Sequence, residues 1–158
     1  MQESLIKILI IDDSDVVRKF MRKLLEISFK AYVHECENPK DAFTYLKDNE
    51  IDIIILDMQM PIMDGLTALK YLRANPRFVN TPVIACTALS SSNLLVQLGQ
   101  LKIADYIVKP ASTELIIQKV SKVIESFRNS VPKNEEIDQN EPAMQVNSED
   151  SNKDVQIL

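Results

Sequence analysis

The chain has 158 residues, and 46 % of them are hydrophobic, which is the share expected of one ordinary globular domain. Its 18 basic and 23 acidic side chains give a net charge of −5, which argues against nucleic acid or an anionic membrane as the main partner. No apolar run approaches the roughly 20 residues of a membrane-spanning helix, and no secretory signal opens the sequence, so we expect a cytoplasmic protein.

Five short apolar stretches alternate with segments of helical spacing along the chain. The expected strands cover residues 5–11, 31–36, 51–56, 82–86 and 104–108. The expected helices cover residues 15–28, 39–48, 65–74, 91–101 and 112–128. Side chains that can cap a helix start stand before several of these helices, as Ser14, Asn38 and Asp64 do. Because each connection is one helix long, the pattern predicts an α/β fold with a parallel sheet between two layers of helices.

The last thirty residues differ from the rest in composition. Residues 129–158 hold two basic and seven acidic side chains and no aromatic residue, whereas residues 1–128 hold sixteen of each charge. Such a polar, charged stretch cannot bury enough apolar surface to fold alone. We therefore expect one domain over residues 1–128, followed by an acidic disordered tail over residues 129–158.

Polar residues follow the predicted strands at the points where these strands end. Asp12 and Asp13 follow the first strand, Asp57 the third, Thr87 the fourth and Lys109 the fifth. The carboxyl ends of parallel strands meet at one edge of a sheet, and ligands bind there. Three acids, a hydroxyl and an ammonium are therefore expected to converge on this edge. The alternative for the first two acids is that they only favour the start of the next helix.

Crowded carboxylates need a partner, because two of them about 4 Å apart repel by about 4 kcal/mol near a protein surface. A hard cation such as Mg²⁺ prefers oxygen ligands and would offset that repulsion. A carboxylate held in this way can attack phosphorus, while a lysine and a hydroxyl bind phosphoryl oxygens. The pattern therefore favours phosphoryl transfer to an aspartate.

Four motifs in this order resemble those of the receiver domains of bacterial response regulators. They are IIDDSD (10–15), LDMQMPIMDG (56–65), CTA (86–88) and DYIVKP (105–110), and the resemblance spans residues 5 to about 127. It implies the flavodoxin-like, doubly wound sheet with strand order 2-1-3-4-5 and five helices. It also implies a phosphorylated signalling protein of two-component systems that acts through protein–protein interaction and catalyses only its own phosphorylation and dephosphorylation.

The resemblance assigns the phosphoryl group and the metal to particular residues. It implies that Asp57 is phosphorylated, that Asp13 binds Mg²⁺ directly and that Asp12 supports the ion, largely through water. The Gln59 backbone carbonyl would be a further ligand. Gly65 closes the turn after the third strand.

The resemblance also implies a switch. Lys109 would pair with the phosphoryl group, Thr87 would move to hydrogen-bond it, and Tyr106 would turn inward as Thr87 leaves its resting place. The bond between Lys109 and Pro110 is expected to be cis, an isomer that costs little before proline.

The expected partners follow from the same resemblance. The phosphoryl donor would be a sensor histidine kinase or a histidine phosphotransfer protein, and the output protein would bind the face formed by the fourth helix, fifth strand and fifth helix. A phosphorylation-dependent homodimer stays open. The basic side chains on the first helix suit either docking of the donor or a solvated helix face; they are Arg18, Lys19, Arg22 and Lys23.

Other functions fit less well. A receiver-like binding scaffold that is never phosphorylated predicts missing residues at the sheet edge, and none is missing. An aspartyl-phosphate enzyme needs a substrate lid that no insertion supplies. A dinucleotide-binding enzyme needs glycines after the first strand, where there are none.

Three further features carry expectations about structure. Lys102 and Ile103 stand where the family commonly has Gly-Ala, so the turn there is expected to be tighter or shifted. His34, the only histidine, is expected in the core or at the sheet edge, away from the acidic residues. Cys36 and Cys86 fall on strands about 14 Å apart in the implied order, which rules out a disulfide between them.

Overall fold

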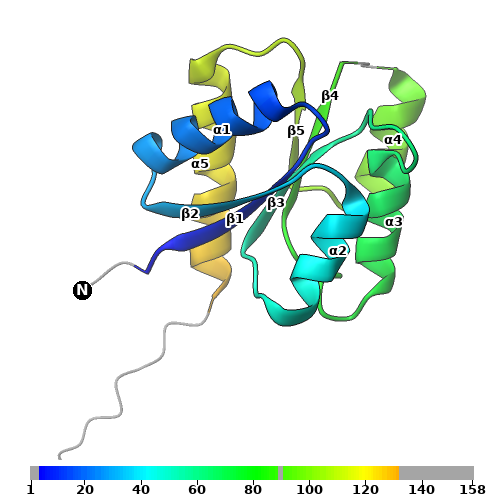
Figure 1. Cartoon of the computed structure of the whole chain (residues 1–158), viewed down its shortest axis with the longest axis horizontal. Helices are drawn as coiled ribbons and strands as arrows, with labels where there is room; N and C mark the ends of the chain where they lie inside the picture. Colours follow the sequence, from blue (N-terminus) through cyan, green and yellow to red (C-terminus); the bar gives the residue numbers. More distant parts are fainter. Residues whose placement is uncertain (1–3, 89–90, 132–158) are drawn as a thin grey trace, which may run out of the picture.

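The computed structural model describes residues 4–88 and 91–131. Its five strands are all parallel and follow the order β2-β1-β3-β4-β5 (Figure 1). The strands are β1 (Ile6–Ile11), β2 (Ala31–Cys36), β3 (Ile53–Asp57), β4 (Val83–Thr87) and β5 (Asp105–Val108). The helices are α1 (Asp15–Ser28), α2 (Pro39–Asp48), α3 (Gly65–Ala74), α4 (Ser92–Gln100) and α5 (Thr113–Ser130). The predicted fold class and strand order are confirmed.

The helices cover both faces of the sheet. Helices α1 and α5 lie on one face, and α2, α3 and α4 lie on the other (Figure 1). Successive side chains of a strand point to opposite faces, so Leu9 and Ile11 of β1 pack toward α2 and α3 while Ile8 and Ile10 pack toward α1 and α5. Burial on both faces explains why β1 and β3 read as almost continuous apolar runs.

Polar caps fix the helix starts that the sequence indicates. The Ser14 hydroxyl accepts from the backbone N–H of Val17, and the Asp64 carboxylate accepts from that of Thr67 at 2.7 Å. Asn38 caps α2 in the same way. Each cap satisfies a backbone donor that has no partner inside its helix. The helices therefore start within one residue of the predicted positions.

The end of α5 lies beyond its predicted position. The helix continues through Ser130, so residues 129 and 130, which the composition predicts to belong to the tail, are helical. Residues 132–158 of the expected tail lie outside the described residues.

The turn after α4 contains Lys102 and Ile103, where the sequence predicts a tighter or shifted turn. The N–H of Lys102 donates to the carbonyl of Gly99, and that of Ile103 donates to Leu98. This is the Schellman pattern, which requires a left-handed residue at the first position, and Lys102 accordingly has φ 51°. The helix therefore ends at Gln100 with its usual closing geometry, although a lysine occupies a position that favours glycine.

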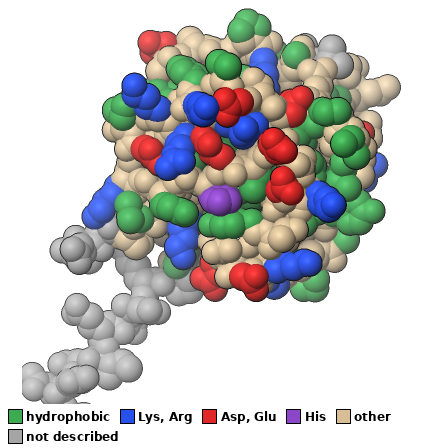
Figure 2. Space-filling model, viewed as in Figure 1, with side chains coloured by type: hydrophobic (Ala, Val, Ile, Leu, Met, Phe, Trp, Pro, Cys, Tyr) green, Lys and Arg blue, Asp and Glu red, His purple; other side chains and the backbone are tan. Residues whose placement is uncertain are grey.

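The two cysteines and the histidine take the expected places. Cys36 and Cys86 are free and buried, on β2 and β4, with β1 and β3 between them. The single histidine of the sequence, purple in Figure 2, lies on β2, and its ring stacks on Tyr45 of α2 with the ring centres 3.6 Å apart. Acidic and basic side chains are interspersed on this face. No helix in residues 4–88 or 91–131 is long and apolar enough to cross a membrane.

Candidate functional site

Polar side chains are buried at only one place in the described part of the chain. They are Asp12, directly after β1, Asp57, the last residue of β3, and Thr87, the last residue of β4. The two aspartates are 3 % and 4 % exposed, and Thr87 is fully buried. Charged groups are rarely buried to this degree without a partner, so the arrangement points to a functional site at the carboxyl edge of the sheet.

Three carboxylates come together at this edge. Asp12, Asp13 and Asp57 each offer an oxygen, and these oxygens lie within 4.8 Å of one another. Asp13 is exposed, so the cluster opens to solvent on that side. An oxygen-only set with this charge and spacing fits a hard divalent cation that keeps several water ligands.

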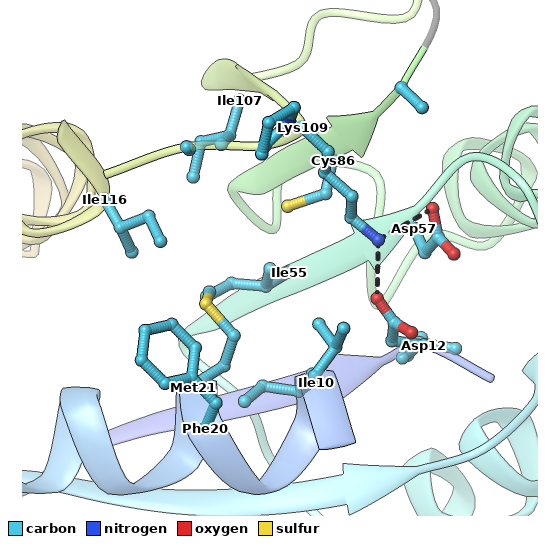
Figure 3. A pocket seen from close by; sticks show the side chains of 15 residues that line it. Ile10, Asp12, Phe20, Met21, Ile55, Asp57, Cys86, Ile107, Lys109 and Ile116 are labelled. Atoms are coloured by element: carbon cyan, nitrogen blue, oxygen red, sulfur yellow. Dashed lines mark hydrogen bonds and ion pairs between the residues drawn. The ribbon is translucent and has the colours of Figure 1, made fainter. Parts of the chain in front are cut away.

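Lys109 joins the two buried acids across the sheet. Its ammonium nitrogen lies 2.8 Å from an oxygen of Asp12 and 3.3 Å from an oxygen of Asp57 (Figure 3). The neighbouring strand β4 helps to position Lys109, because the backbone N–H of Lys109 donates to the carbonyl of Thr87 at 2.8 Å. The bond from Lys109 to Pro110 is cis, as expected.

The charges in the site shift one another's protonation. Burial raises the pKa of Asp57 above its ordinary value; the Gln59 N–H and the Lys109 ammonium oppose this shift, and the Asp12 carboxylate adds to it. Burial acts against the charge of Lys109 as well, but its hydrogen bond and attraction to Asp12 outweigh that effect and raise its pKa. Lys109 therefore stays charged at neutral pH.

The loop after β3 is folded tightly against the end of that strand. The N–H of Gln59 donates to the Asp57 carboxylate at 3.1 Å, and the N–H of Gly65 donates to the carbonyl of Met58 at 3.2 Å. A side chain at position 65 would collide with the Asp57 carbonyl oxygen and the Met58 backbone. Gly65 is therefore required by close approach of the backbone, and its role is to hold the loop that carries Gln59.

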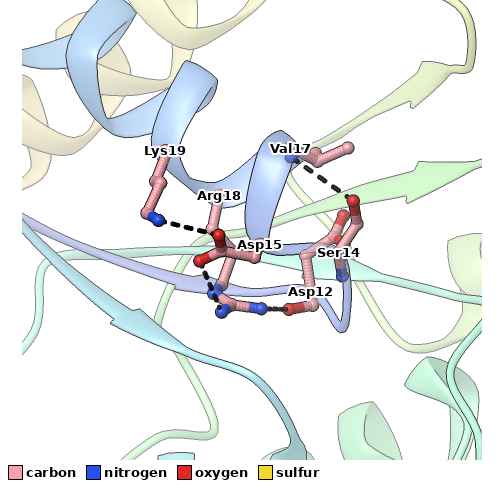
Figure 4. Close-up of polar contacts among 6 residues, drawn as sticks. All are labelled: Asp12, Ser14, Asp15, Val17, Arg18 and Lys19. Carbon is pink, nitrogen blue, oxygen red and sulfur yellow. Dashed lines mark hydrogen bonds and ion pairs between the residues drawn. The ribbon is translucent and has the colours of Figure 1, made fainter.

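Asp12 is held by groups at the start of α1. Its carboxylate accepts from the N–H of Ser14 at 2.8 Å, and its carbonyl accepts from the Arg18 guanidinium at 2.8 Å (Figure 4). The Arg18 side chain is only 11 % exposed. The sequence predicts only that Arg18 lies on a basic helix surface. It does not reveal this contact, because helical periodicity shows which face a residue occupies and not whether its side chain bonds back to the preceding loop.

The basic face of α1 is partly neutralised within the helix. Lys19 pairs with Asp15 at 2.7 Å, and Arg22 pairs with Glu26 at 3.0 Å. Exposed pairs of this kind contribute little to stability. They do reduce the positive charge that α1 presents to a partner.

The residues of the expected switch lie in different environments. Thr87 is buried, whereas Tyr106 on β5 is 37 % exposed. The Lys119 ammonium lies 5.0 Å from the centre of the Tyr106 ring and pairs with Asp105 at 2.6 Å. In this structure Tyr106 therefore points outward. On α5, Leu115 is exposed, whereas four apolar side chains are buried against the sheet: Ile116, Val120, Val123 and Ile124.

Known proteins match this chain in sequence and in fold. The family model for the response regulator receiver domain matches residues 8–121. The chemotaxis protein CheY of Pseudomonas aeruginosa is 29 % identical over 119 residues, covering 75 % of this chain and 96 % of that protein. CheY-3 of Vibrio cholerae serotype O1 is 30 % identical over 119 residues, covering 75 % and 92 %.

A solved receiver domain confirms the architecture. The signal receiver domain of a signal transduction histidine kinase from Syntrophus aciditrophicus is 26 % identical and superposes with a TM-score of 0.70, covering 81 % of this chain and 98 % of that one. The fold, the acidic edge and the family model agree. The chain belongs to the response regulator receiver domain family.

Proposed function

We propose that this chain accepts a phosphoryl group on Asp57 from the phosphohistidine of a sensor histidine kinase or a histidine phosphotransfer protein, and that it signals by binding another protein. One observation carries the proposal. The Asp57 carboxylate is buried beside a second buried carboxylate, Asp12, and a single ammonium, Lys109, bridges the two. The two curated relatives described above are named as chemotaxis proteins, which supports a signalling role.

Mg²⁺ would be held by Asp12, Asp13, Asp57 and the backbone carbonyl of Gln59. When bound, it supplies positive charge that lowers the repulsion between the carboxylates and the incoming phosphoryl oxygens. The spacing of the three carboxylates supports this ligand set.

Each residue of the site then has its own role in phosphoryl transfer. An Asp57 oxygen attacks phosphorus, an O–P bond forms, and the P–N bond to the donor histidine breaks with its electron pair passing to the imidazole. Lys109 pairs with the phosphoryl oxygens, and Thr87 donates a hydrogen bond to them. The space that Thr87 leaves admits Tyr106, which turns inward from the exposed position it has here.

This change alters the face formed by α4, β5 and α5, where we place the output partner. Exposed apolar side chains already stand on these elements; they are Val96, Tyr106 and Leu115. The same face suits a phosphorylation-dependent homodimer, which sedimentation of the phosphorylated protein would detect. We place this activity in the cytoplasm.

The test is labelling by a small phosphodonor with Mg²⁺. Incubation with acetyl phosphate should add the mass of one phosphoryl group, and hydroxylamine should remove it. Asp57→Asn should abolish the label. Asp64→Asn is the matched control: it makes the same chemical change in the loop that follows Asp57, and asparagine caps α3 as well as aspartate does. A label that persists at another residue contradicts the assignment of Asp57.

Absence of any label, in a folded protein that still binds Mg²⁺, would favour the alternative of a receiver-like binding scaffold. Chelation of Mg²⁺ should suppress labelling of the wild type. If labelling is unaffected by chelation, the proposed ligand set is wrong.

A further inference from the structure

A cavity of about 450 Å³ lies between α1, α5 and the sheet, next to the carboxyl edge (Figure 3). Its volume lies within the range of small-molecule sites in proteins. The space is partly open to solvent, so a molecule from solution can enter it. The mechanism proposed above uses the residues at one end of it, Asp12, Asp57 and Lys109, and leaves its apolar part without a role.

The walls of the cavity are almost entirely apolar. Buried side chains from the sheet and from both helices line it; examples are Ile10, Met21, Ile107 and Ile116. The Cys86 thiol also points into it, and burial raises the pKa of this thiol to about 12, so it adds no charge. Two helices and the sheet thus form a site that favours an apolar molecule.

Phe20 and Ala111 also line the cavity. Phe20 of α1 is 48 % exposed although its ring borders the apolar space. Ala111, between β5 and α5, has a small side chain at the lining. An exposed aromatic ring beside apolar walls gains burial when a ligand fills the space.

One end of the cavity is polar and negatively charged. Within the described chain its charged lining residues are Asp12, Asp57 and Lys109, two carboxylates against one ammonium. Exposed Asp13 lies next to this end and adds negative charge. In the absence of Mg²⁺, a cationic group is attracted to such an end, whereas an anionic group is repelled.

We propose that this cavity binds a small molecule with an apolar, preferably aromatic, body and one cationic amine, the body lying between α1 and α5 and the amine at Asp12 and Asp57. The amine and Mg²⁺ use the same two carboxylates. Occupation of the cavity and binding of Mg²⁺ therefore oppose each other, and by linkage each weakens the other by the same factor. Inhibition of phosphorylation by such a ligand rests on the proposed function, whereas binding of the ligand does not.

The test compares three probes of one shape: 4-phenylbutylamine, 4-phenylbutanol and 4-phenylbutyrate. Binding is followed by methyl resonances of Ile10, Ile107 and Ile116 in the absence of Mg²⁺. The amine should bind about tenfold more tightly than the carboxylate, with the alcohol between them. Saturating Mg²⁺ should weaken binding of the amine by a similar factor and leave binding of the alcohol nearly unchanged. Equal affinities of amine and carboxylate, or shifts confined to other residues, overturn the proposal.

Variants locate the site independently. Ala111→Phe should fill the cavity and weaken binding of the amine at least about tenfold, because the apolar body of the ligand loses its space. Ala74→Phe makes the same change at an exposed position of α3, away from the cavity, and should leave binding unchanged. If Ala111→Phe does not fold, the probe series and the competition with Mg²⁺ still decide the matter, because they use the wild-type chain.

Labelling by acetyl phosphate separates the two proposals. A chain that is labelled on Asp57 but does not distinguish amine from carboxylate refutes only the cavity proposal. A chain that binds the amine at the cavity but is not labelled refutes only the proposed function.

Discussion

Two partly buried cations are held in opposite ways at two places in this molecule. At the carboxyl edge of the sheet, Lys109 pairs with the carboxylates of Asp12 and Asp57. At the junction of α3 and α4, every hydrogen bond that Arg73 donates within the described residues goes to a backbone carbonyl. The acceptors belong to Phe78, Thr81, Leu101 and Lys102.

The difference lies in what each cation can do. Arg73 has only dipoles around it, so burial lowers its pKa, and its role is to tie two loops to a helix end. Lys109 faces formal charges, and their attraction raises its pKa despite burial. A cation among carbonyls stabilises one structure, whereas a cation between carboxylates responds whenever the charge of those carboxylates changes.

The largest effect should follow from removing the cation between the carboxylates. We expect Lys109→Met to slow labelling of Asp57 by about a hundredfold or more, because the phosphoryl oxygens lose a preorganised positive charge. The rate of mass gain with acetyl phosphate measures this. Arg73→Met should leave that rate unchanged at temperatures where the variant is folded, and a comparable slowing in both variants would remove the distinction drawn here.

Removing the other cation should mainly cost stability. We expect Arg73→Met to lower the free energy of unfolding by about 2 kcal/mol, because several partly buried carbonyls lose their donor. Urea denaturation measures the loss. Arg77→Met is the control, since Arg77 is exposed and donates to a single carbonyl, that of Lys47. Equal losses of unfolding free energy in the two variants would show that the hydrogen bonds of Arg73 stabilise the protein no more than the single hydrogen bond of Arg77.

A smaller effect should appear in the pH dependence of stability. The pKa of Asp57 is raised in the folded state, so the unfolded chain releases this proton first as pH rises from 3.8. The contribution of Asp57 is therefore fully present below pH 3.8 and is lost as pH rises through the folded value. In Mg²⁺-free buffer, stability of the wild type should fall across this window relative to that of Asp57→Asn. A constant difference between the two curves contradicts the raised pKa.

The smallest effect should come from the turn that Arg73 holds. Lys102 has φ 51°, a conformation that costs energy for any residue with a side chain. Lys102→Gly should stabilise the protein by about 0.5 to 1 kcal/mol. Lys102→Ala keeps the strain and removes only the charge, so it should give no gain. If both variants stabilise equally, loss of the charge, and not relief of strain, is the cause.

The sequence predicted the fold because its signals are local. Strand and helix positions follow from apolar spacing and from caps such as Ser14 and Asp64, and each cap acts within three residues of chain. The end of α5 was less well predicted, because residues 129 and 130 are polar and continue the helix without apolar spacing.

Arg73 shows where such reasoning stops. In the sequence it is a basic residue in the last turn of a helix, a common and unremarked position. Two of its acceptors, Leu101 and Lys102, lie 28 and 29 residues further along the chain. No periodic pattern connects those positions, because the contact exists only once α3 and α4 pack side by side.

The sequence by itself determined which side chains stand at the carboxyl edge, because the parallel direction of the strands brings the residue after each apolar run to the same edge. Tertiary structure alone decided how these groups face one another: the Lys109 ammonium between Asp12 and Asp57, the Arg18 guanidinium on the Asp12 carbonyl and the cavity between α1 and α5. The physical reason is that these features depend on distances between separately packed elements, and packing fixes such distances to within fractions of an ångström, whereas residue spacing does not express them.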